Sequence, residues 1–159
     1  MQHPRIFTTQ ALLPGQTLEL EAAMSRHVAR VLRMRIGQQL ILFNGRSGEI
    51  DAEITRVLQS RVWVTLGNWK PGQVKPPITV HLGQVISRGE RMDYVVQKAT
   101  ELGVDAITPL FSQRCGVQLD RQRQTKRQQH WQQIAISSCE QSGRCNVPTI
   151  HAPICLASW

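Results

Sequence analysis

The chain has 159 residues, with 19 Lys and Arg against 11 Asp and Glu, and a formal net charge of +8. This length allows one domain or two small ones, and a hydrophobic share of 41% excludes the intrinsically disordered class. Of the 19 cations 15 are arginine, whose planar guanidinium binds phosphate through two parallel hydrogen bonds. The composition therefore favours an anionic partner, with nucleic acid as the first candidate.

The sequence also argues against a membrane span, a signal peptide and a zinc site. No stretch approaches the roughly 18 apolar residues of a membrane span, and residues 1–5 lack the apolar core of a signal peptide. We therefore expect a cytoplasmic protein with no membrane partner. No pair of cysteines has the CxxC spacing of zinc ligands, so we expect reduced thiols and no metal site, with the four cysteines at Cys115, Cys139, Cys145 and Cys155.

The first part of the chain predicts short strands separated by turns. Alternating or β-rich runs occupy residues 18–21, 39–43, 49–54 and 62–66. Asn44 and Gly45 end the second run with a pair favoured in tight turns. Several short strands at close spacing predict a small barrel, which removes exposed sheet edges.

A helix between Ala22 and Gly37 is expected to interrupt these strands, with Ser25 as its cap and Gly37 as its stop. Its apolar positions follow helical spacing on one face, at Met24, Val28, Val31 and Leu32. Its arginines follow the same spacing on the opposite face, at Arg26, Arg30 and Arg33.

This stripe of like charge has no carboxylate to pair with, and like charges at i,i+4 repel by a few tenths of a kcal/mol. A solvated face is the alternative, but the missing carboxylates favour contact with a phosphate backbone. Around the stripe, His27 could stack on RNA or simply be exposed, and other cations extend the positive surface. The predicted RNA-binding residues are Arg5, Arg26, His27, Arg30, Arg33, Arg35 and Arg46.

Proline and glycine are frequent between Lys70 and Pro77, where hydrophobic periodicity is absent. We place a linker at residues 73–77. It separates an N-terminal domain of residues 1–72 from a second domain of residues 78–159.

The second domain alternates strands and helices. Strands are expected at residues 78–86 and 106–111, and residues 148–154 form a third strand or an extended connection. One helix covers residues 94–102, with Val95, Ala99 and Leu102 inward and Gly103 as its stop. A second helix covers residues 121–141 and ends at Gly143, with an inner face of Trp131, Ile134, Ala135 and Ser138. This order implies parallel strands joined by helical crossovers, so the whole chain is of the α+β class.

The long helix begins among cations, with Asp120 as its N-cap. Cations are unfavourable near a helix N-terminus, by about 0.3–1 kcal/mol each at exposed sites. A solvated surface and a cluster that faces RNA both remain open for these residues, which are Arg121, Arg123, Lys126 and Arg127.

Four segments, in order along the chain, carry a resemblance. The segment Ser25–Gly37, followed by Leu42–Gly45, resembles the N-terminal signature of the RsmE family, bacterial methyltransferases that modify N3 of a uridine in small-subunit ribosomal RNA. The later segments that resemble this family are Glu90–Val104, Ile107–Cys115, and Glu140–Arg144 with Val147 and Pro148.

The resemblance implies a PUA-like β-barrel that binds RNA, joined to an α/β domain of the SPOUT type. In the family this second domain holds S-adenosylmethionine in a trefoil knot and forms a homodimer. Its cofactor loops, which include a GPEGG-like turn, have no counterpart between Met1 and Trp159. We therefore expect an incomplete SPOUT domain with no cofactor-binding residues in this chain, and no transfer activity from these 159 residues alone.

The implied reaction requires removal of the weakly acidic N3 proton of uracil, or stabilisation of the anion that develops, beside a sulfonium. Arg114 and Arg144 are candidates to position phosphate or stabilise that charge, and Glu101 and Glu140 to orient them. The predicted catalytic set is Arg114, Glu140 and Arg144.

Structural pairs are the alternative for these residues. Lys98 with Glu101 and Glu140 with Arg144 have the i,i+3 and i,i+4 spacings of ordinary helix pairs. His81, on an apolar strand, is expected to be a core histidine rather than a base. The implied partner is 16S ribosomal RNA or the small ribosomal subunit. The competing function is a non-catalytic module that binds ribosomal RNA.

Overall fold

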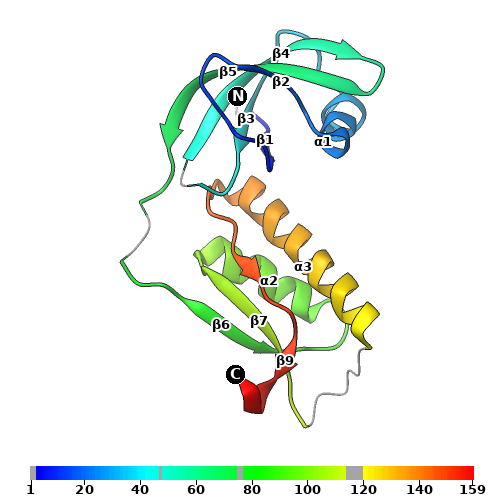
Figure 1. Cartoon of the computed structure of the whole chain (residues 1–159), viewed down its shortest axis with the longest axis vertical. Coiled ribbons are helices and arrows are strands. Elements are labelled where there is room, and N and C mark those ends of the chain that lie inside the picture. The colour runs from blue at the N-terminus through cyan, green and yellow to red at the C-terminus, as the bar shows by residue number, and fades with distance from the viewer. Residues whose placement is uncertain (1–2, 47, 75–76, 114–119) are drawn as a thin grey trace. The chain divides into compact units, whose positions relative to one another are not determined.

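The computed structural model describes residues 3–46, 48–74, 77–113 and 120–159. It divides into two compact units, Met1–Val74 and Lys75–Trp159 (Figure 1), and each unit is described by itself. No helix in the described part of the chain is both long and apolar enough to cross a membrane.

The N-terminal unit is built on one five-stranded sheet with the strand order β1-β3-β4-β5-β2. The short β1 runs parallel to β3, and every other pair is antiparallel. Alternate residues of these strands are buried, as the period-2 pattern predicted. The strands are β1 (Arg5–Phe7), β2 (Thr17–Glu19), β3 (Gln39–Phe43), β4 (Gly48–Leu58) and β5 (Arg61–Pro71).

The segment after β1 connects the two edge strands of this sheet, β1 and β2. The Thr9 N–H donates to the Glu21 carboxylate at 3.3 Å, and the Gln10 side-chain amide donates to the Glu19 carbonyl at 3.0 Å. These bonds draw the chain after β1 against the end of β2, so the sheet curls around a core. That core consists of aliphatic side chains, with Leu40, Leu42, Ile50, Ile54, Val62 and Val64 fully buried.

The helix that carries the arginines differs from the expected one. An α-helical turn, α1 (Ala22–Arg26), continues as a π-helical segment, η1 (His27–Val31). The Leu32 N–H donates to the His27 carbonyl five residues back, at 2.9 Å. The wider turn buries Val28 but leaves Val31 68% exposed, so the prediction that Val31 faces inward is wrong.

Ser25 does not cap this helix, because the helix begins at Ala22. Ser25 is instead buried, and its Oγ donates to the Leu20 carbonyl at 2.8 Å and accepts from the Val62 N–H at 3.2 Å. This hydroxyl therefore joins the helix to the end of β2 and to β5.

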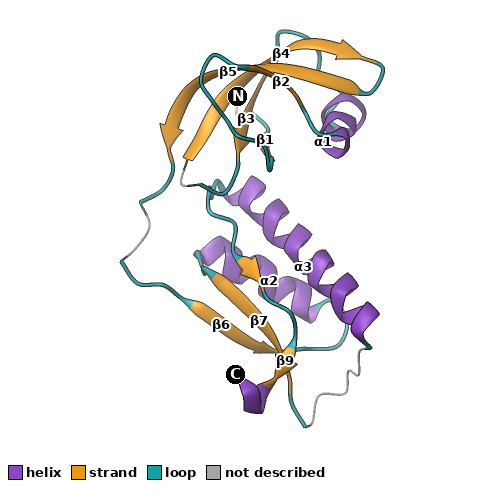
Figure 2. Cartoon of the chain, in the orientation of Figure 1, coloured by secondary structure: helices purple, strands orange, loops and turns teal. Residues whose placement is uncertain are grey.

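The second unit contains a parallel sheet and two helices, as predicted (Figure 2). Strand β7 (Ala106–Phe111) lies between β6 (His81–Val85) and two short strands, β8 (Thr149–Ile150) and β9 (Ile154–Cys155). The helices are α2 (Arg91–Leu102) and α3 (Arg121–Ser142), and a 3₁₀ turn, η2 (Leu156–Ser158), follows β9.

Asp120 caps α3 as predicted, because its Oδ1 accepts from the Arg123 N–H at 2.8 Å. Trp131, Ala135 and Ser138 are buried on the inner face of α3, which also agrees with the prediction. The face of α2 is displaced from the expected one. Its buried residues are Met92, Val96 and Thr100, whereas Leu102 is 83% exposed.

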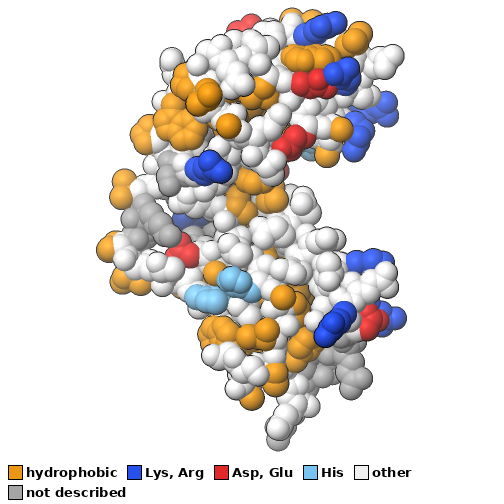
Figure 3. Space-filling model, in the orientation of Figure 1, with side chains coloured by type: hydrophobic (Ala, Val, Ile, Leu, Met, Phe, Trp, Pro, Cys, Tyr) orange, Lys and Arg blue, Asp and Glu red, His pale blue; other side chains and the backbone are white. Residues whose placement is uncertain are grey.

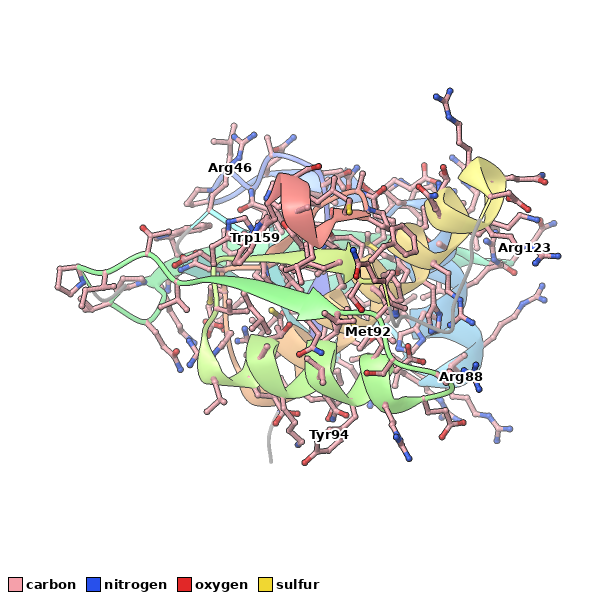
Figure 4. The ribbon with its side chains drawn as sticks, turned by 90° about the horizontal axis from the view of Figure 1, so that it is seen from below. Arg46, Arg88, Met92, Tyr94, Arg123 and Trp159 are labelled. Atoms are coloured by element: carbon pink, nitrogen blue, oxygen red, sulfur yellow. The ribbon has the colours of Figure 1, made fainter. Side chains whose placement is uncertain are left out.

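Both helices pack on the same face of the parallel sheet. Met92 and Val96 of α2 and Trp131 of α3 share one core with Ile107 and Ile150, whose side chains point to that face. Figure 4 shows Met92 between α2 and the strands, with Tyr94 pointing away from them. Trp159 lies on the other side of the strands, where a Cβ at Gly83 would come within 2.5 Å of its ring.

The buried Ser25 hydroxyl leads to a stability prediction. In Ser25→Ala the Leu20 carbonyl and the Val62 N–H lose their partner, and each buried unsatisfied group costs about 1–3 kcal/mol. Urea unfolding should show a lower midpoint with an unchanged slope. Thr17→Ala removes an exposed hydroxyl that bonds to Thr65 and is the matched control, with a change within about 0.5 kcal/mol. Equal midpoints for the two variants would contradict the role assigned to Ser25.

Candidate nucleic-acid interface

The arginine face of α1 and η1 is exposed. Arg26, His27, Arg30 and Arg33 all lie on the surface, and none of the three arginines forms an ion pair within the described ranges. The helix ends at Val31, so the predicted stop at Gly37 is wrong, and Arg33 lies beyond the helix in the left-handed region, with φ of 52°. The structure therefore brings these predicted RNA-binding side chains to one short stretch of surface and leaves their charge uncompensated.

Arg30 connects this helix to the β4–β5 hairpin. Its Nε and Nη2 donate to the Ser60 Oγ at 3.1 Å and 2.8 Å, and Ser60 lies in the turn between the two strands. In Figure 3, Lys and Arg side chains gather over the end of the N-terminal unit that carries α1 and this turn. The basic surface therefore includes both the helix and the hairpin.

Two arginines on the hairpin were missed by the sequence reasoning. The guanidinium carbons of Arg56 and Arg61 lie 5.0 Å and 4.8 Å from the centre of the Trp63 ring. Arg61 also donates from two nitrogens to both carboxylate oxygens of Glu19, each at 2.6 Å. The sequence does show two arginines close to a tryptophan in adjacent predicted strands. It does not show the strand register, which places Arg56 opposite Trp63.

The ion pair between Arg61 and Glu19 changes the pKa of both side chains. The hydrogen bonds from Arg61 hold the pKa of the Glu19 carboxyl below its ordinary value, and the same bonds raise the pKa of Arg61. A carboxyl with a depressed pKa stabilises the fold above its unfolded pKa, and loses that contribution as pH falls through the lower folded value. Glu19 and Arg61 are therefore both charged at neutral pH.

Arg35 and Arg46 are exposed, as an RNA contact requires, and neither forms an ion pair in the described part of the chain. Arg5 differs, because its side chain is only 8% exposed. It pairs with Glu49 and lies over the Phe43 ring, 5.0 Å from the centre. This placement gives Arg5 a role within the barrel, and offers no support for its predicted contact with RNA.

In the second unit, Arg144 lies at the carboxyl end of α2. Its Nε donates to the Glu101 carbonyl at 2.7 Å. Gly103, with φ of 92°, leaves the space that the guanidinium fills, since a Cβ there would lie 2.4 Å from an Arg144 nitrogen. Arg144 thus satisfies a helix-terminal carbonyl, a role that favours cations because the carboxyl end of a helix is partly negative.

The structure gives less information about the other catalytic candidates. Glu140 is half-buried in the last turns of α3, and Arg114 lies outside the described residues. Glu101 forms the i,i+3 pair with Lys98 that was the structural alternative, at 2.8 Å, and the Lys98 hydrogen bond lowers the pKa of Glu101. The described residues bring Arg144 and Glu101 together, but through the Glu101 backbone.

Two cavities border the second unit. One of about 570 Å³ is lined by four side chains on one face of α3, namely Arg123, Lys126, Arg127 and His130. Asp120 lies 3.4 Å from Arg123, and Asp93 contacts His130 at 2.9 Å. The cavity is therefore basic with carboxylates at its border, and both interpretations of this cluster stay open.

The other cavity, of about 380 Å³, lies on the sheet face opposite the helices. It is lined by His81, Thr108, His151, Ala152, Ile154 and Trp159. His81 is exposed and contacts Thr108 at 2.8 Å, so the prediction that it is a core histidine is wrong. Within the described segments, no group of three His, Cys, Asp or Glu side chains could hold a metal ion.

Family comparisons agree with this two-part architecture. The family described as RNA methyltransferase domain matches residues 74–159, and the one described as RNA methyltransferase PUA domain matches residues 20–65. Ribosomal RNA small subunit methyltransferase E of Buchnera aphidicola is 35% identical over 98% of this chain. The chain belongs to the RNA methyltransferase family, whose domain model matches more than half of its residues. The protein of the same name from Bacillus subtilis is 29% identical over 90% of the chain.

Two solved structures of related proteins share the fold. A Legionella pneumophila methyltransferase in complex with bound SAM has 41% identity and a TM-score of 0.94 over 99% of this chain. The Neisseria gonorrhoeae RsmE bound to S-adenosyl methionine has 39% identity and a TM-score of 0.90 over 96%. The predicted fold class, a PUA-like barrel with an α/β SPOUT domain, is confirmed. The chain spans 63–65% of the length of the Buchnera, Legionella and Neisseria proteins.

The bidentate pair on the hairpin gives a pH prediction. In Arg61→Gln the Glu19 carboxyl loses its hydrogen bonds and neighbouring charge, so its pKa should rise towards the ordinary value. Carbon-detected NMR titration of the carboxyl groups measures this shift directly. Lys70→Gln removes a cation that is paired with Asp51 and not with Glu19, so it is the matched control. An unchanged Glu19 titration in Arg61→Gln would show that the pair does not form in solution.

Proposed function

We propose that this chain is the RNA-binding and partial catalytic portion of an enzyme that methylates N3 of a uridine in 16S ribosomal RNA. The observation that carries the proposal is the uncompensated arginine face of α1 and η1, in a PUA domain followed by an RNA methyltransferase domain. The names of the relatives support the ribosomal substrate.

The arginine face has the chemistry that ribosomal RNA requires. Phosphate contacts from Arg and Lys release condensed counterions, which provides affinity and makes it depend on salt. Arg26, Arg30 and Arg33 meet this requirement because no carboxylate in the described ranges neutralises them. We place the RNA backbone against this face, which orients the substrate without reading its sequence.

S-adenosylmethionine is the proposed methyl donor, since two structural relatives hold it. It supplies an electrophilic sulfonium methyl group when bound. The two cavities of the second unit fit this molecule poorly, because it carries a cationic sulfonium and an ammonium besides its carboxylate and adenine. The α3 cavity is lined by cations, and the cavity beside Trp159 is lined by no carboxylate.

The poor fit favours a second candidate function for residues 1–159 taken alone, a non-catalytic module that binds ribosomal RNA. In this reading the barrel docks RNA and the second unit acts as a scaffold. For the whole enzyme we propose a cytoplasmic homodimer that acts on 16S ribosomal RNA or the small ribosomal subunit. We place Arg144 and Glu140 near its catalytic centre, together with Arg114.

Loss of the arginine face should weaken RNA binding. Arg26, Arg30 and Arg33 changed together to Gln remove up to three phosphate contacts, so the slope of log K against log salt should fall by about 2–3. Filter binding of a 16S ribosomal RNA fragment over a salt series measures this slope. Lys70→Gln removes a cation that is already paired with Asp51, and it is the control expected to keep the slope. A triple variant with the wild-type slope would exclude this face as the RNA contact.

Residues 1–159 should not bind the methyl donor. Isothermal titration of these residues with S-adenosylmethionine should give no heat of binding, because neither cavity of the second unit has a carboxylate among its lining side chains to pair with the sulfonium and the ammonium. The Neisseria gonorrhoeae relative, crystallised with this ligand, is the positive control. Tight, stoichiometric binding by residues 1–159 would refute the proposal that these residues lack the cofactor pocket.

A further inference from the structure

Two arginines of the β4–β5 hairpin, Arg56 and Arg61, lie over the same tryptophan ring, but only Arg61 pairs with a carboxylate. Arg56 is directly opposite Trp63 in the strand register, and Arg61 precedes Trp63 by two residues on the same strand. Side chains with this placement share one face of the sheet. Both guanidiniums lie within 5.0 Å of the ring centre, and attraction to the ring face restricts their motion.

Glu19 distinguishes the two arginines. Glu19 is also opposite Trp63, on β2, and its carboxylate accepts two hydrogen bonds from Arg61. Arg56 has no hydrogen bond or ion pair from its guanidinium to any described residue. The charge of Arg61 is therefore neutralised within the protein, whereas Arg56 keeps a full positive charge on an exposed surface.

This hairpin is continuous with the arginine face. Ser60, in the turn between β4 and β5, accepts both hydrogen bonds from Arg30 of η1. Ser25 ties the same helix to β5 at Val62, the residue beside Trp63. The helix and the hairpin thus form one surface within the N-terminal unit, fixed by hydrogen bonds at two points.

We propose that the RNA-binding surface extends onto the hairpin, where Arg56 binds a backbone phosphate of the RNA and Arg61 does not. This inference rests on the proposed RNA-binding function and assigns a further residue to it. Trp63 holds the Arg56 guanidinium in place, so less side-chain entropy is lost when a phosphate binds. Glu19 occupies the hydrogen-bonding edge of Arg61 and repels phosphate from it.

Phosphate fits Arg56 better than a nucleobase does. The Trp63 ring already stacks against two guanidiniums and is half-buried, so little of it is available to a base. The N–H groups of Arg56 lie in a planar fork that matches the paired oxygens of phosphate. The contact is therefore independent of RNA sequence and sensitive to salt.

Salt dependence separates the two arginines. For Arg56→Gln, the slope of log K against log salt should fall by about 0.7–0.9, the value of one phosphate contact. The double variant Glu19→Gln with Arg61→Gln removes a neutral pair, so its slope should match the wild type. Glu19→Gln alone releases Arg61 to bind a phosphate, so its slope should rise by the same amount.

Lys70→Gln is the matched control for net charge. It makes the same change in charge as Arg56→Gln on the same strand pair, but removes a cation held by Asp51. Circular dichroism of each variant checks that the barrel is folded. If Arg56→Gln keeps the wild-type slope, or if the neutral double variant loses as much slope as Arg56→Gln, the proposal is refuted.

The same salt series separates this inference from the proposed function. If the wild type binds the 16S ribosomal RNA fragment no better than the triple variant of Arg26, Arg30 and Arg33 does, the proposed RNA-binding face itself is wrong. If the triple variant loses slope and Arg56→Gln does not, the helix binds RNA and the extension onto the hairpin fails alone.

Discussion

The Ser25 hydroxyl is the interaction on which the arrangement of the N-terminal unit depends. It joins the carbonyl of Leu20 to the N–H of Val62, and so fixes the helix against the start of β5. Because both backbone groups are buried, water cannot replace the serine without a free-energy cost. The position of the arginine face relative to the hairpin follows from this contact.

The distribution of charge over this unit is selective. Carboxylates pair with Arg5, Arg61 and Lys70, which lie on the strands, whereas Arg26 and Arg30 on the helix have no carboxylate partner in the described ranges. Ion pairs at exposed sites add little stability, so their main effect here is to decide which cations remain available. The cations left without a carboxylate partner in the described ranges lie on one helix and on the adjoining hairpin.

In the second unit, helix ends and sheet faces determine what each polar residue can do. Arg144 fills the space above Gly103 and satisfies a carbonyl at the end of α2, which gives it a structural contact besides any catalytic one. One sheet face packs on α2 and α3, and the other carries His81 and Trp159. A parallel sheet ordinarily has both faces buried, but α2 and α3 both pack on the first face, so His81 on the second face is exposed.

The sequence by itself determined the family, the two-part α+β architecture, the strands of the barrel and the long helix with its cap. These features depend on local patterns, namely alternation, helical spacing and capping residues. Such patterns can be recognised in the sequence without knowledge of tertiary contacts. It also placed Arg26 and Arg30 on one helix. Only the tertiary structure decided the phase of α2, the π-helical turn that exposes Val31, and the buried role of Ser25. It also paired Arg5 with Glu49, and Arg61 but not Arg56 with Glu19. Each of these depends on strand register and on packing between distant segments, which no local pattern encodes.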